Sequence, residues 1–423
     1  MVNIKKINLV LAYDVKVYTF ALFLINLNKN LPIMKKLTLS LSLLAATGLF
    51  FAACNDDDNN GTSEKAQVVA NYADIVYQNY KDAYDDAVEL EAAINAFTAA
   101  PTAEKFETAK TKWKEARETY GPTEAFRFAN GPIDAEDGPE GLLNSWPLDE
   151  AYIDYVEGGL PTAGIINNVA EYPAITKDLL VELNGAESEE SVSVGYHAIE
   201  FLLWGQDLTA PSEDKPGLRT FEDYVDNGTT ADNEARRRQY LNVCADLLTD
   251  HLDQMVQTWK PGGTYRSTFL NLNENVALTN ILLGIITLSD SELPTERMSV
   301  ALRNASQEDE HSCFSDNTHR DIALNLQGIV NVYKGQYGSI SGPSIEDLVT
   351  KANPTVAGSI GSYIASSTTK VNAILRPFDY AISGGETSPE GIKVAAAATD
   401  IRLLAEQLLA GSAAIGITVN GVE

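Results

Sequence analysis

The stretch "EKAQVVANYADIVYQNYKDAYDDAVELEAAINAFT", residues 64–98, decides the fold class. Its apolar side chains recur every three or four positions, from Val68 and Tyr72 to Leu90 and Phe97, which is the spacing of one long amphipathic helix. Similar patterns follow at about 102–120, 190–205, 232–259, 266–289, 318–335, 357–375 and 389–411. Alternating strand patterns are nearly absent from the sequence. We therefore expect an all-α protein built from helical bundles.

The length of the chain, 423 residues, favours more than one hydrophobic core. We expect two helical-bundle domains, at 64–210 and 233–423. Between them, "LTAPSEDKPGLRTFEDYVDNGTTAD" at 208–232 is polar, rich in turn residues and without a helical stripe. This segment is the expected domain connection.

The composition is that of a globular and strongly acidic protein. Hydrophobic residues make up 44% of the chain, and 59 acidic against 31 basic residues give a net charge of -28. Nucleic acid is bound by clustered Lys and Arg, so this balance argues against a nucleic-acid partner. Cations or cationic partners are favoured instead.

The amino-terminal region has the sequence features of an export signal. "MKKLTLSLSLLAATGLFFAACNDDD", which begins at Met34, has two lysines, an apolar run and small residues before a cysteine. We interpret residues 1–53 as a misassigned start followed by a lipoprotein signal peptide, Cys54 as the lipidated residue and 54–63 as a linker. An ordinary signal peptide cut near Ala53, or an uncleaved anchor, is the alternative. The expected location is the outer membrane, with the protein periplasmic or surface-exposed and held to the membrane by its lipid anchor.

The remaining two cysteines are Cys244 and Cys313. In an oxidising envelope they form either one disulfide or two buried thiols.

The segment "GYHAIEFLLWGQD", residues 195–207, places His197 and Glu200 on one face of an otherwise apolar helix. A helix that is apolar nearly all round is buried, and a buried ionisable pair needs compensation. One form of compensation is a mutual hydrogen bond or an arginine in tight packing, which would leave no binding site. The other is a metal ion, Fe or Zn, because imidazole and carboxylate suit such ions.

A second polar segment, "SQEDEHSCFSDNTHRD" at 306–321, holds two more histidines, His311 and His319. Ser315, Asp316 or Asn317 would cap the helix that follows. The crowding of donors and acceptors equally fits a polar pocket.

With "VGYHAIEFLLWGQDL" and "EDEHSCFSDNTHRDI", the chain resembles the imelysin-like family, whose hallmark Gly-x-His-x-x-Glu is here Gly195, His197 and Glu200. The similarity extends to "YGPTEAFRFANGPID", "WPLDEAYIDY" and "ERMSVAL" and covers roughly residues 68–411. The resemblance implies two helical-bundle domains with a site in the cleft between them, an envelope location and a role in iron uptake. Peptidase activity is the historical label of the family.

The resemblance also extends the candidate site beyond the hallmark pair. By matching position, Glu124, Arg127, Asp316 and His319 would join His197 and Glu200 around the cleft, with His311 as a further candidate.

Three functions follow from these observations. The first is an envelope lipoprotein that binds iron, an iron complex or another metal and supports uptake, with an outer-membrane transporter as a possible partner. The second is a metallopeptidase, and the third is a polysaccharide-binding lipoprotein. The zincin pattern of two histidines four apart is missing, and Glu200 cannot readily serve both as tight ligand and as proton acceptor. These points favour binding over catalysis.

Overall fold

The longest element, helix α3, spans Glu64–Ala99 in a computed structural model that describes residues 62–160, 162–228 and 232–420. It begins where the sequence pattern predicts, because the Ser63 side chain accepts a hydrogen bond from the Ala66 amide at 3.0 Å and caps the helix. The predicted leader at 1–53, Cys54 and most of the 54–63 linker lie outside the described residues. The range Thr62–Glu423 forms one compact unit.

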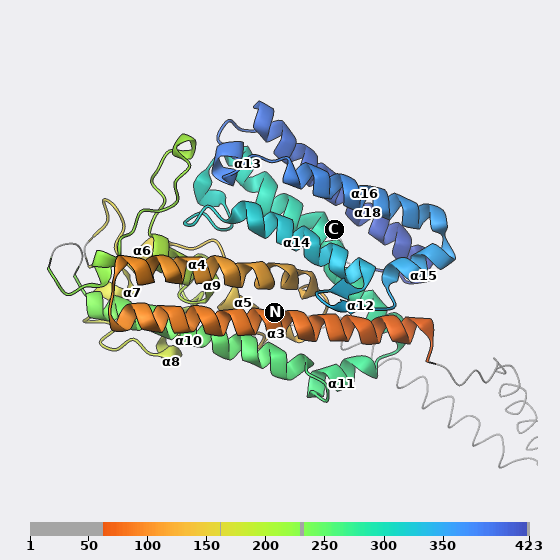
Figure 1. Cartoon of the computed structure of the whole chain (residues 1–423), viewed down its shortest axis with the longest axis horizontal. Coiled ribbons are helices and arrows are strands. Elements are labelled where there is room, and N and C mark those ends of the chain that lie inside the picture. The colour runs from red at the N-terminus through yellow and green to blue at the C-terminus, as the bar shows by residue number, and fades with distance from the viewer. Residues whose placement is uncertain (1–61, 161, 229–231, 421–423) are drawn as a thin grey trace, which may run out of the picture. The chain divides into compact units, whose positions relative to one another are not determined.

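Helix α3 and three further helices form what we call the first helical group. The three are α4 (Ala103–Tyr120), α9 (Gly195–Trp204) and α10 (Glu234–Trp259). Helices α4 and α10 pack on α3, and α9 packs on α4 and α10. Figure 1 shows α3, α4 and α10 running side by side. The group buries the apolar stripe of α3, so the sequence periodicity is satisfied within it.

The second helical group consists of α12 (Glu274–Thr287), the π-helical segment η5 (Leu288–Ser299), α14 (Thr318–Lys334), α16 (Pro354–Asn372) and α18 (Pro389–Ala414). Helix α14 also contacts α4 and the short helix η1 (Gly121–Phe126), which links the two groups. Segments far apart in sequence therefore meet between the groups.

Short elements complete the described chain. The helices are η2 (Pro132–Asp134), α5 (Glu140–Leu143), α6 (Glu150–Ile153), α7 (Gly164–Asn167), α8 (Lys177–Leu183), η3 (Pro211–Glu213), η4 (Phe221–Tyr224), α11 (Thr264–Leu270), α13 (Val300–Asn304), η6 (Gln307–Asp309), α15 (Ile345–Ala352) and α17 (Phe378–Ile382). The strands β1 (Gln336–Tyr337) and β2 (Ile340–Ser341) form one antiparallel pair. The predicted all-α fold class is confirmed.

The predicted helix at 266–289 differs in the structure. It is divided into α11 and α12, because the Asn273 side chain accepts from the Asn275 amide at 3.0 Å and starts a new helix. From there the helical run Glu274–Asn304 is apolar and long enough to cross a membrane, but 56% of its most apolar window is buried within the protein. This burial is that of a core helix.

The segment predicted as a domain connection, 208–232, lies among packed elements. The amide of Gly217 donates to the Phe314 carbonyl at 2.9 Å, and that of Arg219 donates to the Trp204 carbonyl at 2.8 Å. Helix α10, which follows this segment, packs on α3. The chain thus passes from the first group to the second after α11, later than the sequence composition suggests.

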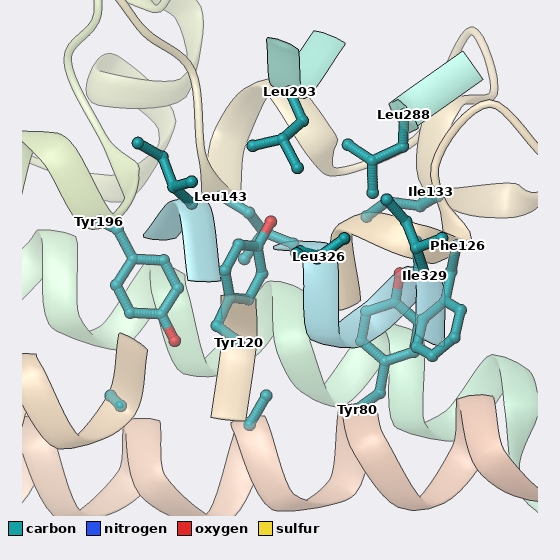
Figure 2. Packing of buried hydrophobic residues seen from close by; sticks show 14 of the residues in the cluster. Tyr80, Tyr120, Phe126, Ile133, Leu143, Tyr196, Leu288, Leu293, Leu326 and Ile329 are labelled. Carbon is teal, nitrogen blue, oxygen red and sulfur yellow. The ribbon is translucent and has the colours of Figure 1, made fainter. Parts of the chain in front are cut away.

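The core between the two groups is filled by apolar and aromatic side chains from both (Figure 2). Tyr120 and Tyr196 of the first group meet with ring centroids 4.8 Å apart. The second group supplies Leu288, Leu293, Leu326 and Ile329. Full burial of each such side chain contributes about 1.5–3 kcal/mol, so this core holds the adjoining polar residues in fixed positions.

Candidate functional site

Helix α9 carries the Gly-x-His-x-x-Glu motif and is buried along its whole length, Gly195–Trp204. Its first residue, Gly195, has φ +89°, and a Cβ there would lie 2.7 Å from the Leu143 carbonyl oxygen. Only glycine fits this close approach without strain. The glycine of the motif therefore lets α9 start tightly against the end of α5.

His197 and Glu200 bond to each other on the inner face of α9. His197 Nδ1 lies 2.9 Å from Glu200 Oε2, and the two side chains are 1% and 0% exposed. Glu200 Oε1 accepts from the amide of Ser315 at 3.0 Å and from its hydroxyl at 2.6 Å. The mutual hydrogen bond is present, and it is the compensation that was expected to leave no binding site at this pair. It occupies Nδ1 of His197, so Nε2 is the atom of this imidazole that remains for a ligand. At this exposure no solvent-open cleft reaches the pair, in contrast to the expected cleft.

The carboxyl group of Glu200 holds a proton near neutral pH. Burial raises its pKa to about 8, although the hydrogen bonds from Ser315 act in the opposite direction. When Glu200 loses that proton, its Oε2 becomes the acceptor for the Nδ1 proton of His197.

A second histidine, His311, lies against the first. The ring centroids of His197 and His311 are 4.6 Å apart at an interplanar angle of 76°. His311 Nδ1 lies 2.9 Å from Asp321 Oδ2, which also accepts from the Ser312 hydroxyl at 2.5 Å. The residues from 306–321 and the hallmark motif thus meet between the two helical groups.

Asp321 stays ionised in this environment. Burial alone would raise the pKa of Asp321, but the Arg117 guanidinium and the bond to His311 hold it well below its usual value. Arg117 donates to Asp321 Oδ1 through Nη2 at 3.0 Å and Nε at 3.3 Å. An ionised Asp321 fixes the proton of His311 on Nδ1, which leaves Nε2 with a free lone pair.

The outer nitrogens of the two imidazoles are the unsatisfied atoms of the site. Nε2 of His197 and Nε2 of His311 are buried and have no hydrogen-bond partner. Burial is the main cause that lowers the pKa of each histidine to about 3, and the buried arginines add to it. Both rings are therefore neutral at physiological pH, which is the form that binds metal ions.

A chain of buried charges supports the two histidines from one side. Arg297 Nη2 donates to Glu124 Oε2 at 2.6 Å, and Arg127 Nη1 donates to the same atom at 3.2 Å. The Asn144 amide donates to Glu124 Oε1 at 3.2 Å and accepts from Arg117 Nη1 at 2.6 Å. Burial raises the pKa of Glu124, but the arginines outweigh it and lower this pKa to about 2.

The other predicted site residues divide into two sets. Glu124 and Arg127 belong to the charge chain beside the histidines. His319 instead contacts the backbone carbonyl of Asp316, with Nδ1 at 3.1 Å, and lines a small cavity with Arg376. The Asp316 carboxylate lies with those of Asp207 and Asp379.

Several residues of the site were not singled out from the sequence. They are Arg117, Asn144, Arg297, Ser312 and Asp321. Arg297 lies within "ERMSVAL", and Ser312 and Asp321 lie within "EDEHSCFSDNTHRDI". The motif segments were a signal for these three, but only the fold shows which of their polar residues face inward.

The structure also tests the predictions for the two cysteines and for the start of α14. Cys244 and Cys313 are free buried thiols and do not form a disulfide. Asn317 is the N-cap residue of α14 but makes no side-chain capping bond. The polar residues of 306–321 therefore serve the buried site more than the helix end.

Two surface cavities lie apart from this site. One of about 630 Å³ is lined by residues of α3 and α10, such as Glu91 and Gln239. The other, of about 520 Å³, is lined by residues that include Tyr155, Leu218 and Arg219. Neither is lined by a histidine.

The fold and site together define a class of all-α proteins with a buried histidine–carboxylate centre between two groups of helices. Within this class the chain belongs to the imelysin family, because the family model described as Imelysin matches residues 76–408. The iron-regulated protein A of Synechococcus elongatus is 27% identical over 378 residues, which covers 86% of this chain and 89% of that protein.

A solved structure has the same fold. A proposed iron-regulated protein A precursor from Parabacteroides distasonis superposes with a TM-score of 0.63 at 19% identity, over 84% of this chain and 97% of that one. The family assignment made from the motif segments is thus confirmed, and the names of the relatives connect the family with iron.

Proposed function

We propose that this protein binds a metal ion, iron first, through the Nε2 atoms of His197 and His311, and that it supports iron uptake. One observation carries the proposal. Two buried, neutral imidazoles lie edge to face, each has its Nδ1 2.9 Å from a carboxyl oxygen, and each has an Nε2 without a partner. Because Glu200 holds a proton near neutral pH, a metal at His197 Nε2 would displace the Nε2 proton while the Glu200 proton passes to Nδ1, so binding should strengthen as pH rises. Carboxylate–histidine pairs of this kind orient metal-binding histidines in other proteins.

The donor set fits such an ion. Imidazole nitrogen suits Fe and Zn, and the buried polar atoms would gain a partner on binding. Glu200 would act behind His197 and not as a direct ligand, because Ser315 and His197 already occupy its two oxygens. The side chains of His197 and His311 are each 1% exposed, so the site suits a bare ion more than a bulky iron complex.

A hydrolytic role fits the geometry less well. A metallopeptidase needs a carboxylate that is free to accept a proton from water. Both Glu200 and Asp321 are instead held by protein donors at full burial. The geometry favours capture of a ligand over its hydrolysis.

The test is metal binding by protein purified without chelators or immobilised metal. Elemental analysis and calorimetry with Fe²⁺ and Zn²⁺ should show about one ion per chain, and His197→Ala or His311→Ala should weaken binding at least ~10-fold. His251→Ala is the matched control, because it removes a half-buried histidine of α10 outside the site. Stoichiometric binding that survives both site substitutions would overturn the proposal.

We further propose that the chain works as an outer-membrane lipoprotein anchored at Cys54. The support is the signal-like segment that ends at Ala53 and the polar residues after the cysteine. Cys54→Ser should move the protein from the membrane fraction to the soluble envelope fraction without a loss of metal binding. Retention in the membrane fraction would contradict lipid anchoring at this residue.

A further inference from the structure

Three aspartates from separate parts of the chain meet outside the histidine site. Asp207 follows α9, Asp316 precedes α14, and Asp379 lies in α17. Each offers a carboxylate oxygen within 4.8 Å of the others. We call this set the aspartate triad.

Two members of the triad have buried oxygens that no donor reaches. Asp207 is 4% exposed, and its Oδ1 accepts from the Thr209 amide at 3.0 Å and hydroxyl at 2.9 Å, while its Oδ2 has no partner. Asp379 is also 4% exposed, and its Oδ1 has no partner. A buried carboxylate oxygen without a donor is costly, so these atoms indicate a missing positive partner.

The surroundings do not supply that partner. Within the described part of the chain, no lysine or arginine forms an ion pair with the triad, and Lys114 is the cation that acts on Asp316 from a distance. Glu310 adds a fourth acid that is 1% exposed and whose oxygens have no hydrogen-bond partner of normal geometry. Burial is the main cause that raises its pKa, and all three aspartates add to it. Thr318 only partly offsets this effect.

The raised pKa values of two triad members also indicate a missing cation. Burial and then the neighbouring carboxylates raise the pKa of Asp316 to about 7, and burial followed by the effect of Asp207 raises that of Asp379 to about 6. Acids with such values are poorly stabilised as anions unless a cation is present.

We propose that Asp207, Asp316 and Asp379 together bind one hard divalent cation, with Ca²⁺ as the first candidate. The ligands are all oxygen, which suits Ca²⁺, Mg²⁺ or Mn²⁺ and not the ions that prefer imidazole. At Ca–O distances of about 2.3–2.6 Å, two oxygens on one ion lie up to about 5 Å apart, as the spacing in the triad allows.

Such a cation would join three segments that support the histidine site. Asp316 is next to Ser315, which donates two hydrogen bonds to Glu200. Gln307, in the same loop, donates to the Asp207 carbonyl at 2.7 Å. The bound ion therefore holds the 306–317 loop against the end of α9 and keeps Ser315 in place.

The experiment compares full-length wild type with Asp379→Asn after treatment with a chelator. Calorimetry should show one Ca²⁺ per wild-type chain and at least ~10-fold weaker binding by the variant. Thermal unfolding adds a readout that also shows the variant is folded. In EDTA, Asp379→Asn should unfold at a higher temperature than wild type, because a repulsive charge is gone, and millimolar Ca²⁺ should reverse this order.

Two controls separate this site from its alternatives. Asp214→Asn removes an exposed acid that also acts on Asp316 and Asp379 but is not part of the triad, so it should keep Ca²⁺ affinity within ~2-fold. His197→Ala should keep Ca²⁺ binding whether or not the histidine proposal holds. The triad proposal is overturned if wild type binds no Ca²⁺, if Asp379→Asn binds it as wild type does, or if either control loses it equally.

Discussion

Two ion pairs join α4 to α14, and they differ in their exposure to water. Arg117 and Asp321 are 1% and 0% exposed, whereas Arg320 and Glu118 are 32% and 44% exposed. Removal of one partner from a buried pair leaves an uncompensated charge, while an exposed pair exchanges its partner for water. The two pairs therefore make a matched comparison at the residue scale.

We predict that Asp321→Asn lowers the free energy of unfolding by about 3–5 kcal/mol and that Glu118→Gln changes it by about 0–1 kcal/mol. Asp321→Asn also weakens the acceptor of the His311 Nδ1 proton, so metal binding should fall with stability. Urea unfolding followed by far-UV circular dichroism at neutral pH measures the free energy of unfolding of both variants. Similar losses in the free energy of unfolding of the two variants would contradict the prediction that breaking the buried pair Arg117–Asp321 costs more than breaking the exposed pair.

Residue types and spacing predict part of the candidate site. His197 and Glu200 stand out because an apolar helix holds two ionisable side chains, and the structure indeed buries both. The same reasoning cannot separate Asp321 from Asp316, five residues earlier. One turns inward to Arg117 and the other toward Asp207, which depends on how α14 packs and not on local sequence.

At the scale of elements, the long helices of 26 residues are predicted closely from the sequence. Helix α10, predicted at about 232–259, spans Glu234–Trp259, and α18, predicted at about 389–411, spans Pro389–Ala414. Each of these two helices has a long buried face, along which buried residues recur every three or four positions, and a turn or capping residue precedes its first residue. The π-helical η5 was not predicted, because its Pro294 reads as a break although packing against α18 keeps the segment helical.

The extra turn width of η5 bears on the site. Arg297 lies near its end and donates to Glu124 of η1 and, through Nη1, to Asn325 of α14 at 2.7 Å. One guanidinium thus joins three elements at full burial. Irregular helical segments of this kind often occur at functional sites, and here the segment places the cation that keeps Glu124 ionised.

Helix α9 shows why an element can be recognised and yet misplaced. Its periodicity predicted a helix from about 190, but the helix starts at Gly195, where the chain approaches Leu143 closely. The sequence contains the glycine, but the neighbour that requires it is about fifty residues away. Tertiary contact, and not helix propensity, sets this boundary.

At the scale of the whole molecule, acidity is the dominant property, with a net charge of -28. Several of the acids are buried without full compensation. Burial, as the largest cause, raises the pKa of Glu200 to about 8 and those of Glu140, Glu308 and Asp316 to about 7. These groups make the stability of the fold depend on pH near neutrality.

The direction of this dependence follows from proton linkage. Between pH 6.5 and 8 the unfolded chain has released these carboxyl protons, whereas the folded protein still holds part of them. The contribution of these protonated carboxyl groups to the free energy of unfolding is present at lower pH and is lost as pH rises through 7 to 8. The histidines oppose part of this trend, because burial lowers their pKa in the folded protein while unfolded histidine, with a pKa of about 6.5, still holds protons at the lower end of the window. Their effect fades above pH 7, where unfolded histidine is mostly neutral, so the carboxyl groups are expected to set the direction.

We therefore predict that the chelator-treated protein melts at least ~2 °C lower at pH 8 than at pH 6.5. Glu200→Gln should reduce the slope, because an amide has no proton to release. Ca²⁺ should reduce it as well, since a cation on the aspartate triad favours ionised Asp316. Differential scanning calorimetry at constant ionic strength separates these contributions. A melting temperature that rises from pH 6.5 to 8 would show that the buried carboxyl groups are ionised in the folded protein and that their positive partners are stronger than the described contacts provide.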